Sequence, residues 1–422
     1  MRFLLDPEQR AFAASLDAML TAADTPSAVR AWAGGDRAPG RALWSRLAEA
    51  GVFALAVPEE YEGVGPLPVE LAVAFVELGR HAVPGPVVET VAAAVLLGEL
   101  SALGDPAPAE RLLPALASGK TLATLALPGH TPAAGPSTPP ARPTPDAGAS
   151  TPPARPTPAA GTSTPPGRHT PNAGTSSPSG RHTPDTDTST PPARPTPDAA
   201  ATSCGGRASD PNPGALYGGY ALDVDAVAVC LVVDGDGLWL ASGHGPVRAS
   251  LDGARRLARP ESGGELLAAG PRVERAARRA LTWARLATAA QALGVGLALL
   301  DRTVEYVGRR TQFGVPVGSF QAVKHRLADA LIALEFARPL LFGAALSTAP
   351  AEVAAAKVTA CEAAYGTARA ALQLHGAIGY TAEYDLSLWF TRARALRSAW
   401  GTPAECRAEA LAGLSGGRRP RS

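Results

Sequence analysis

The sequence has few of the residues on which disulfide-linked and metal-binding proteins depend. Four of its 422 residues are cysteine, and they form no CxxC pair and show no metal-ligand spacing. The formal net charge is only +1, so no excess of positive charge attracts nucleic acid or an anionic membrane. We therefore expect no metal site, no nucleic-acid partner, and free buried thiols in a reducing compartment at Cys204, Cys230, Cys361 and Cys406.

Targeting signals and long apolar runs are also missing. Asp6, Glu8 and Arg10 interrupt the N-terminal apolar residues, whereas a signal peptide needs a basic start and an unbroken apolar run. No apolar stretch reaches the roughly 18–20 residues of a spanning helix. The run at 289–300 contains Gln291 and ends too early. The prediction is a cytoplasmic protein with no membrane span.

Alanine- and leucine-rich helical patterns occupy both ends of the chain. Within residues 6–120, Phe12, Leu16 and Leu20 recur four apart, which places them on one helix face. Residues 271–414 contain long helical patterns with short connections, which are typical of an antiparallel bundle. In this second region we predict helices at about 272–309, 319–346, 350–374 and 384–397, and a last one from 402.

The middle of the chain has β signals instead. Residues 121–127 and 226–233 are strand-like apolar runs, and 234–237 reads as a hairpin turn followed by a strand at 238–241. The predicted fold class is therefore mainly α with a small β domain. The predicted parts are a helical N-terminal domain at 1–120, a β middle domain at 121–268, a C-terminal four-helix bundle at 269–414 and a disordered tail at 415–422.

Tandem repeats interrupt the β region. Residues 135–199 are five copies of a 13-residue unit, the first of which reads GPSTPPARPTPDA. The unit has almost no large apolar side chains, and its prolines prevent regular secondary structure, so we expect disorder over about 130–212. Two interpretations stay open. The repeats could be a recognition segment with PxxP and Thr-Pro sites, or a neutral expansion of a surface loop.

Two motifs in the last third suggest a family. The first is Arg310-Thr-Gln-Phe-Gly followed by Phe320-Gln, and the second is Gln373-Leu-His-Gly-Ala-Ile-Gly. They resemble the two flavin-binding signatures of the acyl-CoA dehydrogenase family, in the same order. Residues 51–65 are similar to the N-terminal region of that family. The resemblance covers nearly all of the chain except about 128–215.

The resemblance implies FAD as cofactor, an acyl-CoA substrate, an electron-transfer acceptor, and a homo- or hetero-oligomer that shares the flavin site. Arg310 matches the arginine that binds the FAD pyrophosphate, and a planar guanidinium suits this role. Ala377 stands where the family usually has glycine. The other matching cofactor positions are Gln312, Phe313, Gln321, Gln373, Gly376 and Thr402.

Simpler interpretations of these residues stay open. Arg310 could be a solvated charge at a helix end. Gly376 and Gly379 could form a turn between helices, and His375 is expected to be structural rather than catalytic.

The family's catalytic base is missing. Members usually carry a glutamate in a Tyr-Glu-Gly-Thr segment, and the corresponding residues here begin at Ala399 and place Trp400 at the base position. Other members carry it before an arginine in the first bundle helix, and here Ala284 precedes Arg285. Tryptophan and alanine cannot accept a proton from a substrate carbon. By resemblance, Arg285 is a substrate contact near the thioester.

Three hypotheses about function follow. The chain could be a dehydrogenase in which another carboxylate, Glu405 or Glu383, replaces the base. It could be the non-catalytic subunit of a heteromeric acyl-CoA dehydrogenase. It could also be an inactive scaffold whose repeats bind a partner. The middle segment that should contact flavin and thioester is not recognisable, and the repeats lie about where it belongs.

Overall fold

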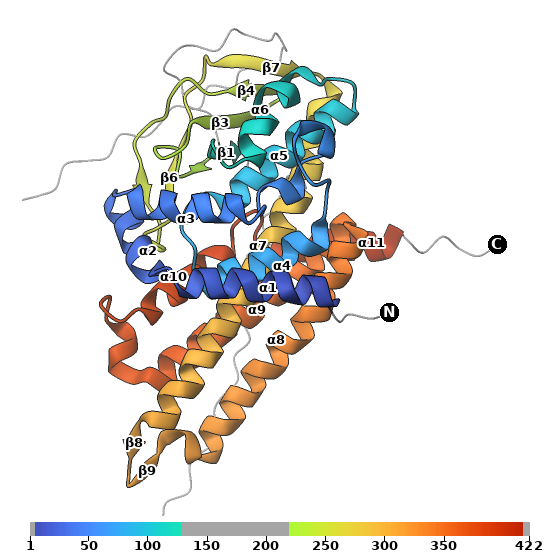
Figure 1. The fold of residues 1–422 in the computed structure, drawn as a ribbon. Helices are drawn as coiled ribbons and strands as arrows, with labels where there is room; N and C mark the ends of the chain where they lie inside the picture. Colours follow the sequence, from blue (N-terminus) through green and yellow to red (C-terminus); the bar gives the residue numbers. More distant parts are fainter. Residues whose placement is uncertain (1–4, 129–218, 417–422) are drawn as a thin grey trace, which may run out of the picture. The chain divides into compact units, whose positions relative to one another are not determined.

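The computed structural model describes residues 5–128 and 219–416 (Figure 1). These residues belong to one compact unit. The predicted disorder of the repeats and of the C-terminal tail falls on residues outside the described ranges, apart from the first two positions of the tail. Residues 415 and 416 lie at the end of a helix, so the predicted disorder is wrong at these two positions.

Six α-helices form the N-terminal region. The first begins with a capping box, because the Asp6 side chain accepts from the Gln9 N–H and the Gln9 side chain accepts in return from the Asp6 N–H. The fifth is buried on nearly all sides, including its single acidic residue in the first turn, Glu89. The helices are α1 (Pro7–Thr21), α2 (Thr25–Gly34), α3 (Ala38–Glu49), α4 (Pro68–Arg80), α5 (Val87–Ala102) and α6 (Ala107–Ala117).

Two small sheets follow, with strand orders β1-β3-β4-β7 and β2-β6-β5. β1 pairs with β3 in parallel although about a hundred residues separate them, and β3 and β4 form the hairpin that the sequence predicted. Figure 1 shows α5 and α6 beside the larger sheet. The strands are β1 (Ala123–Ala126), β2 (Ala221–Leu222), β3 (Val229–Asp234), β4 (Gly237–Leu240), β5 (Arg248–Ala249), β6 (Arg256–Ala258) and β7 (Glu265–Ala269).

Long helices make up the C-terminal region, and the predicted class of a mainly α fold with a small β domain is confirmed. A two-stranded hairpin of β8 and β9 connects the first two of these helices. The elements are α7 (Pro271–Arg309), β8 (Thr311–Gln312), β9 (Val315–Pro316), α8 (Gln321–Ser347), α9 (Pro350–His375), the short 3₁₀ helix η4 (Gly376–Tyr380), α10 (Leu386–Leu396) and α11 (Pro403–Gly416).

A close helix crossing joins the N-terminal and C-terminal regions. A Cβ atom added at Gly79 of α4 would lie 2.0 Å from the carbonyl oxygen of Gln291, and one added at Gly294 of α7 would lie 1.9 Å from that of Val76. Only glycine allows two helix backbones to approach so closely. The crossing therefore places the central part of α7 against α4, with α5 packed beside it.

Two helices contradict the expectation that no stretch is long and apolar enough to span a membrane. α7 and α8 both pass that test by length and composition. The apolar window of α7 is 100% buried inside the protein, which is typical of a core helix, whereas that of α8 is 39% buried. The sequence analysis missed them because it required an unbroken apolar run, and both helices contain polar residues.

Candidate functional site

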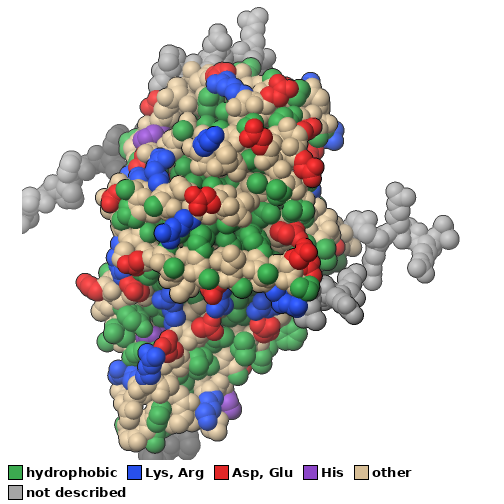
Figure 2. Space-filling view, viewed as in Figure 1, with side chains coloured by type: hydrophobic (Ala, Val, Ile, Leu, Met, Phe, Trp, Pro, Cys, Tyr) green, Lys and Arg blue, Asp and Glu red, His purple; other side chains and the backbone are tan. Residues whose placement is uncertain are grey.

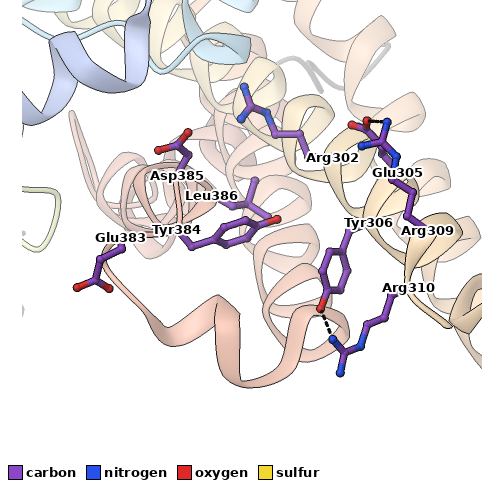
Figure 3. Close-up of a pocket in the computed structure, with 9 residues that line it drawn as sticks. All are labelled: Arg302, Glu305, Tyr306, Arg309, Arg310, Glu383, Tyr384, Asp385 and Leu386. Carbon is purple, nitrogen blue, oxygen red and sulfur yellow. Dashed lines mark hydrogen bonds and ion pairs between the residues drawn. The ribbon is translucent and has the colours of Figure 1, made fainter. Parts of the chain in front are cut away.

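A cavity of about 610 Å³ lies at the C-terminal end of α7. Its walls come from the last turns of α7 and from the segment between η4 and α10 (Figure 3). Arg310 lines this cavity and donates a hydrogen bond to the Tyr306 hydroxyl at 3.1 Å. The guanidinium thus lies at a cavity and is not remote from every cleft. Within the described residues, only one of its N–H groups has a hydrogen-bond acceptor.

His375 supports this wall from behind. Its ring stacks on that of Tyr306 with 4.1 Å between the ring centroids, and the Tyr306 hydroxyl donates to the His375 carbonyl oxygen at 3.4 Å. Burial lowers the pKa of His375, so the imidazole is neutral near pH 7. Nδ1 bonds the Ala371 carbonyl oxygen at 2.8 Å, which makes it the protonated nitrogen. The structural role expected for His375 agrees with this geometry.

The other residues assigned to the cofactor from the sequence are exposed. Phe313 at the tip of the β8–β9 hairpin is 92% exposed and adopts a φ of 53°, which is strained for an aromatic residue. Gly376 ends α9 with a φ of 66° and a ψ of −139°, a backbone conformation that glycine adopts at little cost. The further exposed residues are Gln312, Gln321, Gln373, Ala377 and Thr402. None of these residues, Phe313 and Gly376 included, lines the Arg310 cavity, and Thr402 directly precedes α11.

A second cavity, of about 630 Å³, lies where α5, both sheets and α7 meet the loop before α11. Its apolar walls include residues from β1, β2, β3 and β6. Charged side chains line the remaining part of the cavity wall. They are Glu89, Arg255, Glu274, Arg278, Arg285 and Glu405. Trp400, at the expected position of the base, lines this cavity.

Two buried cations hold the loop that carries Trp400. Nε of Arg285 donates to the Trp400 carbonyl oxygen at 2.9 Å, and Nζ of Lys357 donates to the Gly401 carbonyl oxygen at 2.7 Å. Trp400 itself has a φ of 57°, a left-handed conformation that costs about 1–3 kcal/mol for a bulky residue. The surrounding structure therefore fixes residue 400 in one place at the cavity wall.

The candidate residues for the missing base have different positions. Ala284 is fully buried in the core and does not line the cavity. Glu383 lines the other cavity, at the far end of α7. Glu405 lines the Trp400 cavity, but it forms a capping box in which its Oε2 accepts from the Thr402 N–H at 2.7 Å. Arg285 lines the cavity too, although it also forms an ion pair with Glu409.

Glu89 is a cavity residue that the sequence analysis did not identify. Its residue is 3% exposed, its Oε1 lies 3.5 Å from a guanidinium nitrogen of Arg255, and its Oε2 is buried without a hydrogen-bond partner in the described residues. Burial raises the pKa of Glu89, and Arg255 and the side chain of Trp400 act in the opposite direction. In the sequence, Glu89 stands out only as a single charged residue within the apolar run 87–97. The same pattern is typical of an ordinary acidic residue in the first turn of a helix.

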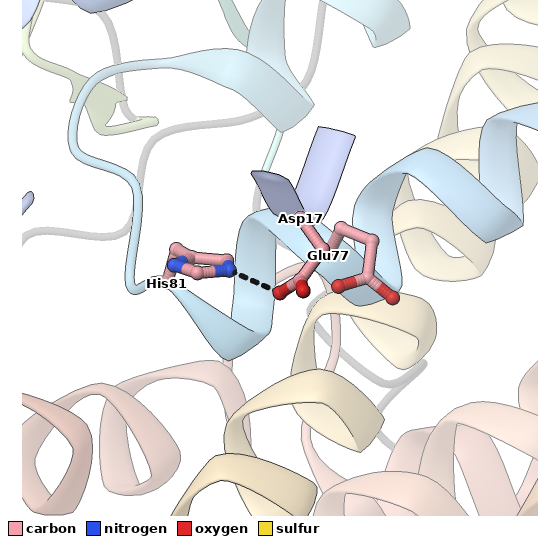
Figure 4. Close-up of side chains that lie close together, drawn as sticks. All are labelled: Asp17, Glu77 and His81. Atoms are coloured by element: carbon pink, nitrogen blue, oxygen red, sulfur yellow. Dashed lines mark hydrogen bonds and ion pairs between the residues drawn. The ribbon is translucent and has the colours of Figure 1, made fainter. Parts of the chain in front are cut away.

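Three side chains elsewhere could hold a metal ion by distance alone. Ligand atoms of Asp17, Glu77 and His81 all lie within 4.8 Å of one another (Figure 4). However, His81 Nε2 already bonds Asp17 at 2.8 Å, and the Arg80 guanidinium lies 3.6 Å from Glu77. Burial raises the pKa of Glu77 to about 7. These contacts account for the cluster as a link between α1 and α4.

The fold defined by these elements is that of the acyl-CoA dehydrogenases. It matches a solved glutaryl-coenzyme A dehydrogenase–glutaryl-CoA complex with a TM-score of 0.69 and 19% identity, covering 100% of this chain and 98% of that one. It also matches a chain of the ChsE4–ChsE5 complex from Mycobacterium tuberculosis, with a TM-score of 0.68 and 20% identity, covering 99% of this chain and 100% of that one.

Sequence comparison assigns the family. Residues 6–120 match the model of the acyl-CoA dehydrogenase N-terminal domain, and residues 274–410 match that of the C-terminal domain. Acyl-CoA dehydrogenase IpdE2 of Mycobacterium tuberculosis is 28% identical over 404 residues, which cover 94% of this chain and 95% of the relative. The chain belongs to the acyl-CoA dehydrogenase family, as the motifs indicated, and FAD is the cofactor of this family.

Proposed function

We propose that the chain binds FAD and an acyl-CoA thioester and catalyses α,β-dehydrogenation of the acyl group. Because the two cavities lie at opposite ends of α7, the Arg310 cavity would contribute to an FAD site shared between subunits, and the cavity beside Trp400 would hold the acyl-CoA. The observation that carries the proposal is the Arg310 guanidinium, supported by Tyr306 and His375 at the wall of a cavity.

The Arg310 cavity has three arginines that could face a dinucleotide diphosphate, Arg302, Arg309 and Arg310. Of its three carboxylates, Glu305 is paired with Arg309 and Asp385 with Arg30. Arg310 retains N–H donors that can bind two phosphate oxygens. Tyr306 restricts its side chain, since the hydroxyl accepts one N–H and the guanidinium carbon lies 5.9 Å from the ring centroid. Gly376 and Ala377 follow His375 and are exposed, and residues with so little side chain let a ligand approach their backbone closely. Bound FAD would supply the acceptor for the hydride that leaves the β carbon.

Residues of this chain would prepare the acyl-CoA for that transfer. The apolar walls of the second cavity would exclude water from the acyl chain, while three arginines and three glutamates line its charged side. Arg285 contributes mainly by positioning, because its Nε holds the Trp400 carbonyl oxygen. A separate electron-transfer acceptor would then take the electrons from the reduced flavin, as the resemblance to the family implies.

A second subunit would complete the FAD site. One face of α8 exposes large apolar side chains, and the β8–β9 hairpin exposes Phe313 beside it. In Figure 2, hydrophobic side chains also reach the surface around the long helices of the C-terminal region. Exposed apolar groups in such numbers mark interaction surfaces. On α8 they are Leu331, Ile332, Phe336, Leu340 and Leu346.

A cytoplasmic location is part of the proposal. Cys230, Cys361 and Cys406 are free and buried. Burial raises the pKa of Cys230 to about 12 and that of Cys361 to about 11, so both thiols are unreactive near neutral pH. Such thiols suit a compartment in which disulfides are rare.

The test is FAD binding by the purified chain and by its Arg310→Ala variant. We expect the wild-type protein to show flavin absorbance bands that bleach when an acyl-CoA is added. Loss of a bidentate phosphate contact should weaken FAD binding at least 10-fold in the variant. Arg275→Ala, an exposed arginine on the same helix, is the matched control and should bind FAD as the wild type does. Equal FAD affinity in all three proteins would contradict the assignment.

Trp400 favours a second candidate function, that of the non-catalytic subunit in a mixed oligomer. The solved ChsE4–ChsE5 structure is a complex of two proteins. Under this alternative, bound flavin stays oxidised with every acyl-CoA until a glutamate-bearing partner is added. Co-purification with such a partner separates the two functions. The third hypothesis, a repeat-mediated scaffold, concerns residues outside the described ranges.

A further inference from the structure

One buried carboxylate in the second cavity is paired with an arginine through only one of its oxygens. Glu89 belongs to α5, and its neighbours Val87, Val88 and Val91 are each 1% exposed. A carboxylate is costly to bury, and a fold that needed only volume here could use an apolar side chain or glutamine. A buried acidic group that lines a cavity is more typical of functional sites than of structural ones.

Glu89 lines the second cavity, and its two oxygens have different surroundings. Its Oε1 faces Arg255 at 3.5 Å, and its buried Oε2 has no hydrogen-bond partner in the described residues. The side chain of Trp400, at the family's base position, lines the same cavity and acts to lower the pKa of Glu89. Glu89 therefore places a carboxylate in the cavity wall that also holds residue 400, and one of its oxygens has no hydrogen-bond partner in the described residues.

We propose that the Glu89 carboxylate is the base that removes the α proton of the bound acyl-CoA. This step rests on the function proposed above. The α C–H bond breaks and its proton binds a Glu89 oxygen, while its electron pair forms the new carbon–carbon double bond. The β hydrogen leaves with its own electron pair as hydride, and FAD, the family's oxidant, is reduced by it. The proton and the electrons thus balance without a further reactant.

The other carboxylates in the cavity wall are less suitable. The Glu274 side chain is 68% exposed and forms an ion pair with Arg278 on the next helix turn. Glu405 caps α11 through the Thr402 N–H. Among the described residues that line this cavity, Glu89 is the buried carboxylate, and it lies against residue 400.

Charged groups around Glu89 set its proton affinity. Burial raises the pKa of Glu89, whereas Arg255, just before β6, and Arg392 of α10 lower it. Asp223 is an acidic group that interacts with Glu89 as a like charge, and Arg392 also forms an ion pair with Asp252. Proton removal by Glu89 should consequently become faster as pH rises through the pKa of this group and then level off.

The test measures exchange of the α protons of a saturated acyl-CoA in D₂O by mass spectrometry, without air. FAD content is read from absorbance and acyl-CoA binding from calorimetry. We expect wild-type protein to exchange the α protons with the pH dependence given above. Glu89→Gln should keep both ligands and slow exchange at least about 100-fold. Glu99→Gln, on the same helix and outside the cavity, should exchange at the wild-type rate.

A double variant distinguishes lost chemistry from lost structure. Glu89→Gln combined with Trp400→Glu returns a carboxylate to the family's base position and should recover exchange relative to Glu89→Gln alone. Wild-type exchange rates in Glu89→Gln would overturn the proposal, as would a wild-type protein that binds FAD and acyl-CoA but exchanges nothing. A wild-type protein that binds neither ligand would overturn the proposed function itself.

Discussion

At the scale of single residues, the second cavity and its surroundings contain residues whose backbone conformation or burial costs free energy. Trp400 has a left-handed backbone, and Glu89 and Asp223 are buried acids. Motif comparison located Arg310 and Trp400 because both lie in contiguous patterns. It could not locate Glu89, since the importance of that residue depends on its contact with a loop about three hundred residues away. A sequence shows which side chains are present, but their burial and neighbours arise only on folding.

Asp223 provides a prediction about pH. Its residue is 0% exposed, and burial raises its pKa to about 7 while the Arg256 N–H acts in the opposite direction. An aspartate in the unfolded chain titrates near 3.9. Between about pH 4 and 7 the folded protein therefore retains a proton that the unfolded chain has lost, so the contribution of Asp223 to stability falls as pH rises.

We expect Asp223→Asn to remove this contribution. Relative to the variant, the wild-type protein should lose stability progressively from pH 4 to 7, by about 4 kcal/mol at most, since one pKa unit corresponds to about 1.4 kcal/mol. Urea unfolding at a series of pH values measures it. Asp236→Asn, in the exposed β3–β4 turn, is the control. An identical pH slope for wild type and Asp223→Asn would refute the prediction.

At the scale of elements, the loop between α10 and α11 depends on cations from two other helices. Arg285 comes from α7 and Lys357 from α9, and the latter is 1% exposed. Lys357 also donates to the Arg397 carbonyl oxygen at 3.4 Å. The loop geometry is thus fixed by side chains that lie far from it in sequence.

Lys357→Met should free this loop while keeping most of the apolar packing of α9. We expect a loss of about 1–3 kcal/mol, because two carbonyl groups lose a charged donor. Faster amide hydrogen exchange should appear at 398–402, measured by mass spectrometry. Arg369→Met replaces an exposed cation on the same helix and should change neither quantity. Unaltered exchange in the loop of Lys357→Met would show that Arg285 alone holds it.

The long elements were predictable, and the short ones were not. The helices expected at 272–309 and 350–374 were found at Pro271–Arg309 and Pro350–His375, since alanine and leucine recur with helical spacing over many turns. The two-residue strands β2 and β5 were missed. Such strands have no period of their own and exist because a partner strand lies beside them.

At the scale of the whole molecule, the exposed face of α8 predicts assembly. Phe336 on this face is 69% exposed. Phe336→Asp should shift the protein toward monomer in analytical ultracentrifugation and weaken FAD binding, because the second subunit would no longer complete the site. Leu251→Asp changes a residue of similar exposure, 65%, in the β region and should leave the mass unchanged. A wild-type protein that is monomeric at all concentrations would contradict the shared site.

The burial of α5 has a consequence for how the protein is made. This helix is apolar on nearly every side, and much of its cover comes from α7. On the ribosome, α6 and β1 soon cover part of α5, but residues 103–270 must be synthesised before α7 begins to appear. During that interval the nascent chain exposes an apolar helix surface, to which chaperones bind. Any product that terminates before residue 309 should accumulate as aggregate, even though its N-terminal helices are complete.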